Sequence, residues 1–107
     1  GENMQAIKEL YDQNIVSREM PGLPNEVIKG KEAVTKKSED WYDNVEEYHG
    51  GDISDPLVAE NHFSCKMSFD CTFKGQGRMQ MEELGVFTVN NGKIVEEQFY
   101  YAMPVTA

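Results

Sequence analysis

Three glutamates of this sequence stand where the alternation of a strand calls for apolar side chains. Glu83 and Glu97 each interrupt a series of alternate apolar residues, and Glu19 shares a strand face with Ile15. A buried carboxylate without a partner is costly, so it persists by pairing, by lining a wet pocket or by taking up a proton. Because desolvation raises the pKa of a carboxyl group towards neutrality, a glutamate in that environment suits general acid or base catalysis. We therefore expect these carboxylates to face the concave side of a sheet, with Glu83 as the candidate base.

The orientation of these carboxylates depends on the register of their strands. Glu82-Glu83 and Glu96-Glu97 are adjacent pairs, so one member of each pair must point outward. A single bulge would exchange the two members. A structural network of hydrogen bonds would explain inward acids as well as catalysis would, and its candidate members are Tyr101, His49 and Arg78. Both interpretations stay open at this level.

The two histidines add a second candidate group for the same face. His49 shares an ideal-strand face with apolar residues, but Gly50-Gly51 directly after it indicates a bulge or a close backbone approach. A structural histidine is the alternative, and His62 falls on the polar face of its strand. Two histidines among scattered acids make no metal-ligand spacing, and the chain shows neither a phosphate-binding glycine loop nor a nucleophile elbow. We therefore expect no metal site.

The elements that would position these residues are clearest between positions 62 and 101. Residues 62–73 alternate without a break between an apolar and a polar face, which predicts a strand with one buried face. Asn90-Asn91-Gly92 favours a hairpin turn because Asn and Gly tolerate positive φ, and residues 74–77 serve the same role one hairpin earlier. The sequence therefore predicts a three-stranded meander over residues 62–73, 78–89 and 94–101.

The first half of the chain is predicted to hold two helices and two further strands. Residues 4–12 have helical spacing, and a second helix from Lys31 to Asn44 places Trp41 on its apolar stripe, as a core anchor or a pocket wall. Alternation, glycine and proline assign the remaining segments. These are a strand over 14–20, a loop over 21–25, an edge pairing at 27–28, a strand over 45–54 bent at its glycine pair, a segment over 56–59 that leads into a turn at Glu60-Asn61, and a loose tail over 104–107.

Composition excludes some classes of partner. The chain has 107 residues, which suits one domain, and it carries 19 acidic residues against 10 Lys plus Arg, a net charge of −9. That charge repels phosphate backbones and anionic membrane surfaces, so we expect no nucleic acid and no membrane as partner. No apolar run has membrane-spanning length and no signal peptide is visible. Two cysteines that cannot pair along one strand fit a cytoplasmic location.

The order of these elements resembles the SnoaL-like polyketide cyclase family, within the nuclear transport factor 2-like superfamily that also holds ketosteroid isomerase. A G-K-x-A-V segment opens the second helix, and N-G-K-I-V-x-E-x-F-Y-Y closes the sheet. The match is good for the fold and weak for the function. The residues that carry it run through most of the chain: Leu10-Tyr11, Ile15-Val16-Ser17, Gly30 to Val34, Trp41 and Asn91 to Tyr100.

The resemblance implies an α+β cystatin-like or nuclear transport factor 2-like cone, in which a strongly curved mixed sheet wraps around two or three helices and an internal pocket. It implies one SnoaL-like domain over residues 1–107, a homodimer through the outer face of the sheet, and neither metal nor organic cofactor. Relatives carry a longer leading helix before the position of Met4. Here that helix is missing, cut off or unobserved, and without it we expect a more open pocket mouth.

The resemblance and the inward acids together favour a cofactor-free cyclase or isomerase acting on a small apolar compound with a carbonyl group. Glu83 would take a proton from the carbon next to the carbonyl, and His49 or Tyr101 would hydrogen-bond the enolate oxygen. The alternative is a non-catalytic member that binds a small ligand or only dimerises, with its carboxylates satisfied by hydrogen bonds. The residues expected to bind the ligand are Glu19, Trp41, Glu97, Phe69, Met81 and Phe99.

Overall fold

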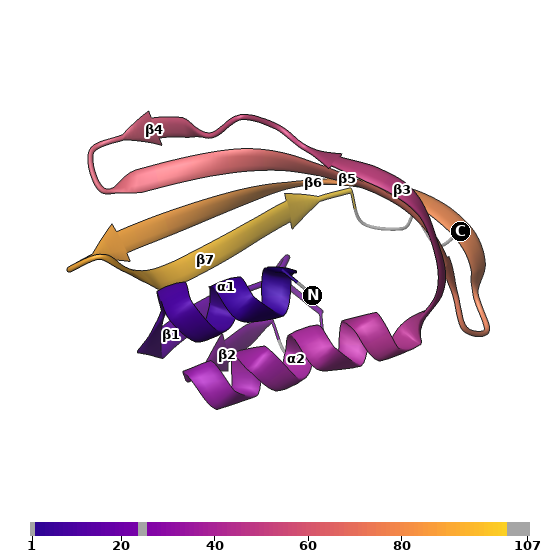
Figure 1. The fold of residues 1–107 in the computed structure, drawn as a ribbon, viewed down its shortest axis with the longest axis horizontal. Helices are drawn as coiled ribbons and strands as arrows, with labels where there is room; N and C mark the ends of the chain where they lie inside the picture. Colours follow the sequence, from indigo (N-terminus) through magenta and orange to yellow (C-terminus); the bar gives the residue numbers. More distant parts are fainter. Residues whose placement is uncertain (1, 24–25, 103–107) are drawn as a thin grey trace.

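One curved sheet with two helices on its concave side makes up the part of the chain that the computed structural model describes, residues 2–23 and 26–102 (Figure 1). The predicted meander and the predicted helix from Lys31 to Asn44 are both confirmed. In chain order the elements are α1 (Glu2–Leu10), β1 (Tyr11–Arg18), β2 (Val27–Lys29), α2 (Lys31–Asn44), β3 (Val45–Ile53), β4 (Leu57–Ala59), β5 (His62–Phe73), β6 (Gly77–Asn90) and β7 (Lys93–Tyr101).

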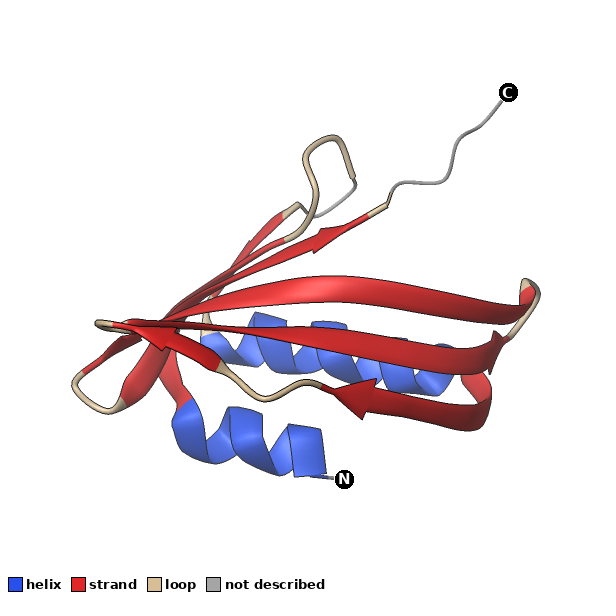
Figure 2. Cartoon of the chain, turned by 90° about the horizontal axis from the view of Figure 1, so that it is seen from above, coloured by secondary structure: helices blue, strands red, loops and turns tan. Residues whose placement is uncertain are grey.

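The sheet is mixed, as the resemblance implies. Its strand order is β2-β1-β7-β6-β5-β3, and β4 also pairs with β5. The β1–β7 pair is parallel, while the other neighbours are antiparallel. Figure 2 shows α2 running behind the long strands β5 and β6, so this helix faces the concave side of the meander. No helix among the described residues is long and apolar enough to cross a membrane.

The hairpin turns form where the sequence predicts them. Between β6 and β7, Asn91 and Gly92 have φ angles of 51° and 77°. Positive φ at both central positions matches the right-handed twist of the flanking strands. Between β5 and β6, the pairing runs unbroken from His62 opposite Thr88 to Phe73 opposite Gly77. The apolar face of β5 therefore stays on the concave side along the whole strand.

The buried core lies where α2 packs against β1 and β7. Ile15, Val34 and Ile94 form its centre, with aromatic and β-branched side chains around them. A second apolar group surrounds Trp41, whose ring lies 5.5 Å from that of Phe69 and 5.7 Å from that of Phe73, centroid to centroid. Trp41 therefore anchors α2 to β5.

The predicted elements differ from the structure at the end of the first helix and just before β5. The first helix ends at Leu10 and β1 begins at Tyr11, because Tyr11 takes an extended backbone that lets it pair with Ile94 of β7. Residues 57–59 lead into a turn as predicted, with Glu60 at a φ of 55°, but they also form the short strand β4, because their backbone pairs with the start of β5. The predicted tail over 104–107 lies outside the described residues.

Candidate active site on the concave face

Glu83 lies half-buried on the concave face, in the middle of β6. Its strand partners are Met67 on β5 and Tyr101 on β7, and Met81 precedes it on the same face. Burial raises the pKa of Glu83 to about 7; the charges of Glu19 and Glu97 add to this effect and that of Lys37 opposes it. No group among residues 2–23 and 26–102 donates a hydrogen bond to its carboxylate. Glu83 is thus a carboxyl group that can take up or release a proton near neutral pH.

Glu97 is the most buried acid of this face, with 3% of its surface exposed. The Tyr11 hydroxyl donates to its Oε2 at 2.7 Å, and the Ser17 hydroxyl donates to its Oε1 at 3.1 Å. The parallel register of β1 and β7 sets Ser17 beside Glu97, which explains the second contact. Burial raises the pKa of Glu97, and the hydrogen bonds from Tyr11 and Ser17 oppose that effect. Both carboxylate oxygens have a donor, so Glu97 holds β1 against β7.

Glu19 follows β1 and receives two donors. Lys37 of α2 places its Nζ 2.5 Å from Glu19 Oε1, and the Tyr101 hydroxyl donates to Oε2 at 2.9 Å. The same Nζ donates to the Ser17 hydroxyl at 2.9 Å and lies 5.3 Å from the centroid of the Phe99 ring. Lys37 therefore joins the two carboxylates through Ser17. We name the residues of this network the concave cluster: Tyr11, Ser17, Glu19, Lys37, Glu83, Glu97 and Tyr101.

Sequence reasoning missed three members of this cluster, Lys37, Tyr11 and Ser17. On α2, Lys37 comes three residues after Val34 and four before Trp41. Residues at those spacings share one helix face. A lysine on a buried face needs a charged partner, so that spacing was the available signal.

The structure does not bring His49 to the concave cluster, which corrects the expected catalytic role of this residue. Its Nε2 lies 2.7 Å from the hydroxyl of Thr72, which is on the outer face of β5. The cause is the register of β3, which shifts between Val45 and Glu47 and again between Tyr48 and Gly50. Each bulge reverses the alternation of side chains, so the ideal-strand face does not apply.

The apolar residues expected to bind a ligand do lie on the concave face. Phe69 is opposite Met81 across the β5–β6 pair, and Phe69 also contacts Trp41. Phe99 is opposite Gly85 on β6 and lies beneath the Lys37 ammonium group. All four of these side chains are only partly buried. Together they provide an apolar surface next to the concave cluster.

The comparison with known proteins decides the family. The SnoaL-like domain matches residues 2–101. The chain belongs to the SnoaL-like family. A crystal structure from Mesorhizobium loti, described as a putative SnoaL-like polyketide cyclase and also as a carbohydrate phosphatase, is 42% identical to this SnoaL-like chain. The two structures superpose with a TM-score of 0.89, over 94% of this chain and 86% of that one.

Two less similar structures share the fold of this SnoaL-like chain. A hypothetical protein from Catenulispora acidiphila with a ketosteroid isomerase-like fold, in complex with trimethylamine, is 16% identical, with a TM-score of 0.77 over 96% of this chain and 78% of that one. A nuclear transport factor 2-like protein of unknown function from Burkholderia pseudomallei is 8% identical, with a TM-score of 0.79 over 94% and 79%. The predicted fold class is therefore confirmed. No curated protein matches the chain.

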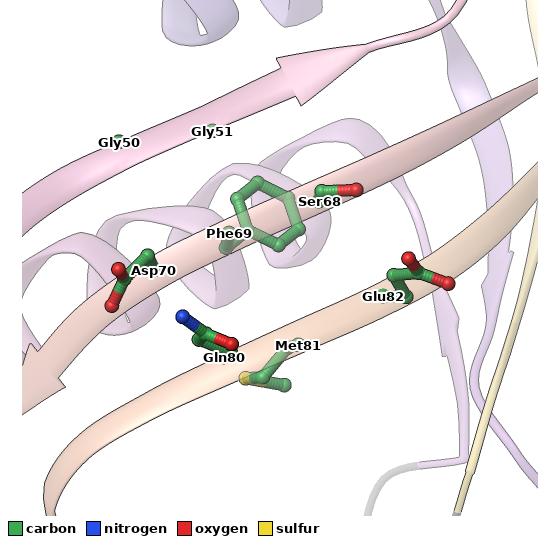
Figure 3. Close-up of a pocket in the computed structure, with 8 residues that line it drawn as sticks. All are labelled: Gly50, Gly51, Ser68, Phe69, Asp70, Gln80, Met81 and Glu82. Atoms are coloured by element: carbon green, nitrogen blue, oxygen red, sulfur yellow. The ribbon is translucent and has the colours of Figure 1, made fainter.

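The outer face of this SnoaL-like sheet carries a hollow of about 450 Å³, away from the concave cluster (Figure 3). Its polar side chains come from alternate positions of β5 and β6, and the backbone of Gly50 and Gly51 borders it on β3. Its acidic groups are already paired: Arg78 makes two hydrogen bonds to Asp70 and holds the pKa of that carboxyl below its usual range. The outward glutamate Glu82 pairs with Lys66 at 3.3 Å. The hollow therefore offers no group prepared for proton transfer.

Within the part of the chain that the structure describes, no three His, Cys, Asp or Glu side chains come together in a way that would hold a metal ion. The chemistry that the concave cluster offers is proton transfer by Glu83, beside one cation and an apolar surface.

Proposed function

We propose that this SnoaL-like chain transfers a proton next to the carbonyl group of a small apolar compound, with Glu83 as the base and without a cofactor. One observation carries the proposal. Glu83 is a half-buried carboxyl group with a pKa of about 7, flanked by Met67 and Met81. A catalytic acid or base works best when its pKa lies near the operating pH, because both protonation states are then populated.

The reaction follows from these two states. Ionised Glu83 takes a proton from the carbon next to the carbonyl; the C–H bond breaks, and its electron pair moves through a new C=C bond onto the carbonyl oxygen. Protonated Glu83 then returns the proton to another carbon, which isomerises a double bond. If the enolate carbon instead attacks a second carbonyl of the same molecule, a C–C bond closes a ring, the π bond of that carbonyl breaks, and protonated Glu83 gives its proton to the resulting alkoxide. Both an isomerase and a cyclase can start from this step.

The rest of the concave cluster would hold Glu83 in this state. Glu19 stays close enough to raise the pKa of Glu83 because Lys37 and Tyr101 fix its carboxylate. Tyr101 was expected to donate to the enolate, but its single hydroxyl hydrogen goes to Glu19. Its role in the proposal is therefore to position Glu19. Trp41, Phe69, Met81 and Phe99 would contact the apolar part of the substrate.

The relative from Mesorhizobium loti supports the cyclase class, because one of its two descriptions is a putative polyketide cyclase. The other description, carbohydrate phosphatase, names a different reaction. The argument for this chain therefore rests on Glu83 and not on the relative.

The test is exchange of hydrogen for deuterium at the carbon next to the carbonyl, followed by proton NMR in D₂O. Small apolar ketones such as cyclohexenone and 1-indanone serve as probes, so the natural substrate is not needed. We expect the protein to accelerate exchange and Glu83→Gln to lower that rate by about 100-fold or more. Glu82→Gln is the matched control, since its carboxylate is on the outer face and pairs with Lys66. A Glu83→Gln variant with full exchange activity would overturn the assignment.

A second candidate function is binding of a small apolar ligand without turnover. It is favoured by the contacts of the cluster itself, in which Glu97 and Glu19 are each satisfied by two donors within the protein. A carbon-13 NMR titration of the Glu83 side chain separates the two functions. A pKa near 7 supports proton transfer, whereas a value near the ordinary pKa of about 4.3 supports a binding role.

The same proposal includes a homodimer through the outer face of the sheet. Leu84 and Tyr100 lie opposite each other on β6 and β7 and point outward, with 43% and 50% of their surfaces exposed. An exposed apolar pair of this kind suits face-to-face packing of two sheets.

A further inference from the structure

Lys37 has one hydrogen-bond donor to spare. An ammonium group carries three hydrogens and no acceptor. One hydrogen of Lys37 is directed at Glu19 Oε1 and one at Ser17 Oγ. Among the described residues, no third oxygen or nitrogen accepts from this group. The ring of Phe99 supports the charge from one side, which stabilises a cation without taking a conventional hydrogen bond.

Lys37 is also the cation that acts on Glu83 within the concave cluster. Glu19 binds both Lys37 and Tyr101, and Tyr101 is the strand partner of Glu83, so Lys37 lies in the same part of the concave face as Glu83. The charge of Lys37 favours the ionised form of Glu83. A substrate whose carbon faces Glu83 would place its carbonyl oxygen within the same small region. The other two groups considered for that oxygen cannot donate to it. His49 lies on the outer face, and the hydroxyl hydrogen of Tyr101 goes to Glu19.

We propose that Lys37 binds the carbonyl oxygen of the substrate and stabilises the negative charge that develops on it. This inference rests on the proposed function of Glu83. Proton transfer moves one negative charge from the Glu83 carboxylate to the substrate oxygen and leaves the total charge of the site unchanged. A fixed cation at the oxygen stabilises the enolate more than the neutral ketone, and this difference is what accelerates the reaction.

The inference also defines a ligand class: flat apolar molecules that carry an oxyanion conjugated to the ring. Such a molecule resembles the enolate, and it binds best when Glu83 carries its proton, because the charges then match the state after proton transfer. The groups that face Glu83 are Glu19 after β1, Lys37 on α2, and Glu97 and Tyr101 on β7. Of these, Lys37 alone is a cation.

The test uses 4-nitrophenol, because its neutral and anionic forms differ in visible absorbance. We expect the full chain to bind the phenolate form, and Lys37→Met to weaken that binding by about tenfold or more, as for loss of a hydrogen bond to a charged group. Lys36→Met is the matched control, since Lys36 is the neighbouring exposed lysine and pairs with Asp40. Wild-type affinity for the phenolate in Lys37→Met, or no phenolate binding by the wild type, would overturn the inference.

A second measurement covers the case in which Lys37→Met fails to fold. The side-chain NMR signal of Lys37 in the wild-type protein, assigned with Lys37→Arg, should shift when 4-nitrophenolate is added. An unshifted signal with bound phenolate contradicts the inference.

The two proposals fail separately. If Glu83→Gln stops deuterium exchange and Lys37→Met leaves exchange and phenolate binding intact, the inference fails and the proposed function stands. If Lys37 binds the phenolate and Glu83→Gln exchanges at the wild-type rate, Glu83 is not the base and the proposed function fails, and with it the catalytic part of the inference.

Discussion

Glu83 holds its negative charge less readily in the folded chain than in water, because burial and the charge of Glu19 both disfavour the ionised form. Its folded pKa, about 7, is above the ordinary glutamate pKa of about 4.3. Between these two values the folded state binds more protons than the unfolded state. The free energy of unfolding therefore falls as pH rises through this window, and the full decrease in stability is present above about pH 7.

Replacing Glu83 by an uncharged residue of the same shape should remove the decrease in stability that ionisation of Glu83 causes. We expect Glu83→Gln to be more stable than the wild type by about 1 to 2 kcal/mol at about pH 8, and to differ little from it at about pH 4. The figure is below the full value of about 1.4 kcal/mol per pKa unit because the carboxylate is partly solvated. Urea unfolding at both pH values measures the difference. Glu82→Gln should show no such gain, and an equal gain at both pH values would contradict an effect of ionisation.

At the same scale, alternation predicted which face of each strand carries Glu83 and Glu97, since a period of two needs only the local sequence. Glu82 and Glu96 pair outward with Lys66 and Arg18. The partners of the inward acids were harder to predict. Tyr11, Ser17 and Lys37 reach Glu97 and Glu19 from other elements, and only the packing of α2 and β1 brings them together.

At the scale of single elements, β3 shows where alternation stops being informative. The glycine pair after His49 correctly indicated irregularity in this strand. The first register shift, however, lies between Val45 and Glu47, before the glycines, where no residue type announces it. A bulge depends on how the partner strand curves, which the sequence of one strand does not contain. His49 was misplaced for this reason.

Gly51 is the residue of β3 that the curved pairing requires. A Cβ atom at this position would overlap the backbone carbonyl oxygen of Ser68 on β5 and lie 2.7 Å from the Tyr48 hydroxyl. Neither the carbonyl nor its strand can move without disturbing the β3–β5 ladder. We expect Gly51→Ala to lower the free energy of unfolding by about 1 to 3 kcal/mol, the usual cost of overpacking.

Gly50 provides the control for this prediction. A Cβ at Gly50 meets no heavy atom within 4 Å. Gly50→Ala should therefore change the stability by no more than about 0.5 kcal/mol. Urea unfolding of the two variants side by side measures the difference. Equal stabilities would show that β3 yields at Gly51 and that the close approach to Ser68 is not a constraint.

At the scale of the whole molecule, the resemblance to the SnoaL-like family predicted the curvature of the sheet, which the periodicity of the strands does not specify. Alternation in 62–73 and 78–89 predicted strands with one buried face, and nothing in that pattern specifies how far the sheet bends. The closing segment from Asn91 to Tyr100 linked the chain to a family with a conical sheet, and the structure confirms the curved mixed sheet. The parallel contact between β1 and β7 joins the two ends of the chain, so no local pattern announces it.

The outer face of the sheet leads to the last prediction, on association. Two copies that pack through Leu84 and Tyr100 bury an exposed apolar pair, but each copy carries a net charge of −9. The apolar pair favours association and the charge opposes it, and salt screens only the charge. We therefore expect sedimentation velocity at micromolar concentration to detect a dimer that becomes tighter as the salt concentration rises.

Leu84→Lys should weaken this dimer by about tenfold or more, as for the loss of an apolar anchor at an interface. The substitution lowers the net negative charge of each copy, so weaker association cannot come from greater overall repulsion. Leu10→Lys makes the same change at the end of α1, on the opposite, helix-covered side of the sheet, at a side chain that is 47% exposed, and should leave the dimer intact. A wild-type monomer at every salt concentration would rule out the dimer. Equal effects of the two substitutions would show that the contact between copies lies elsewhere than on this face.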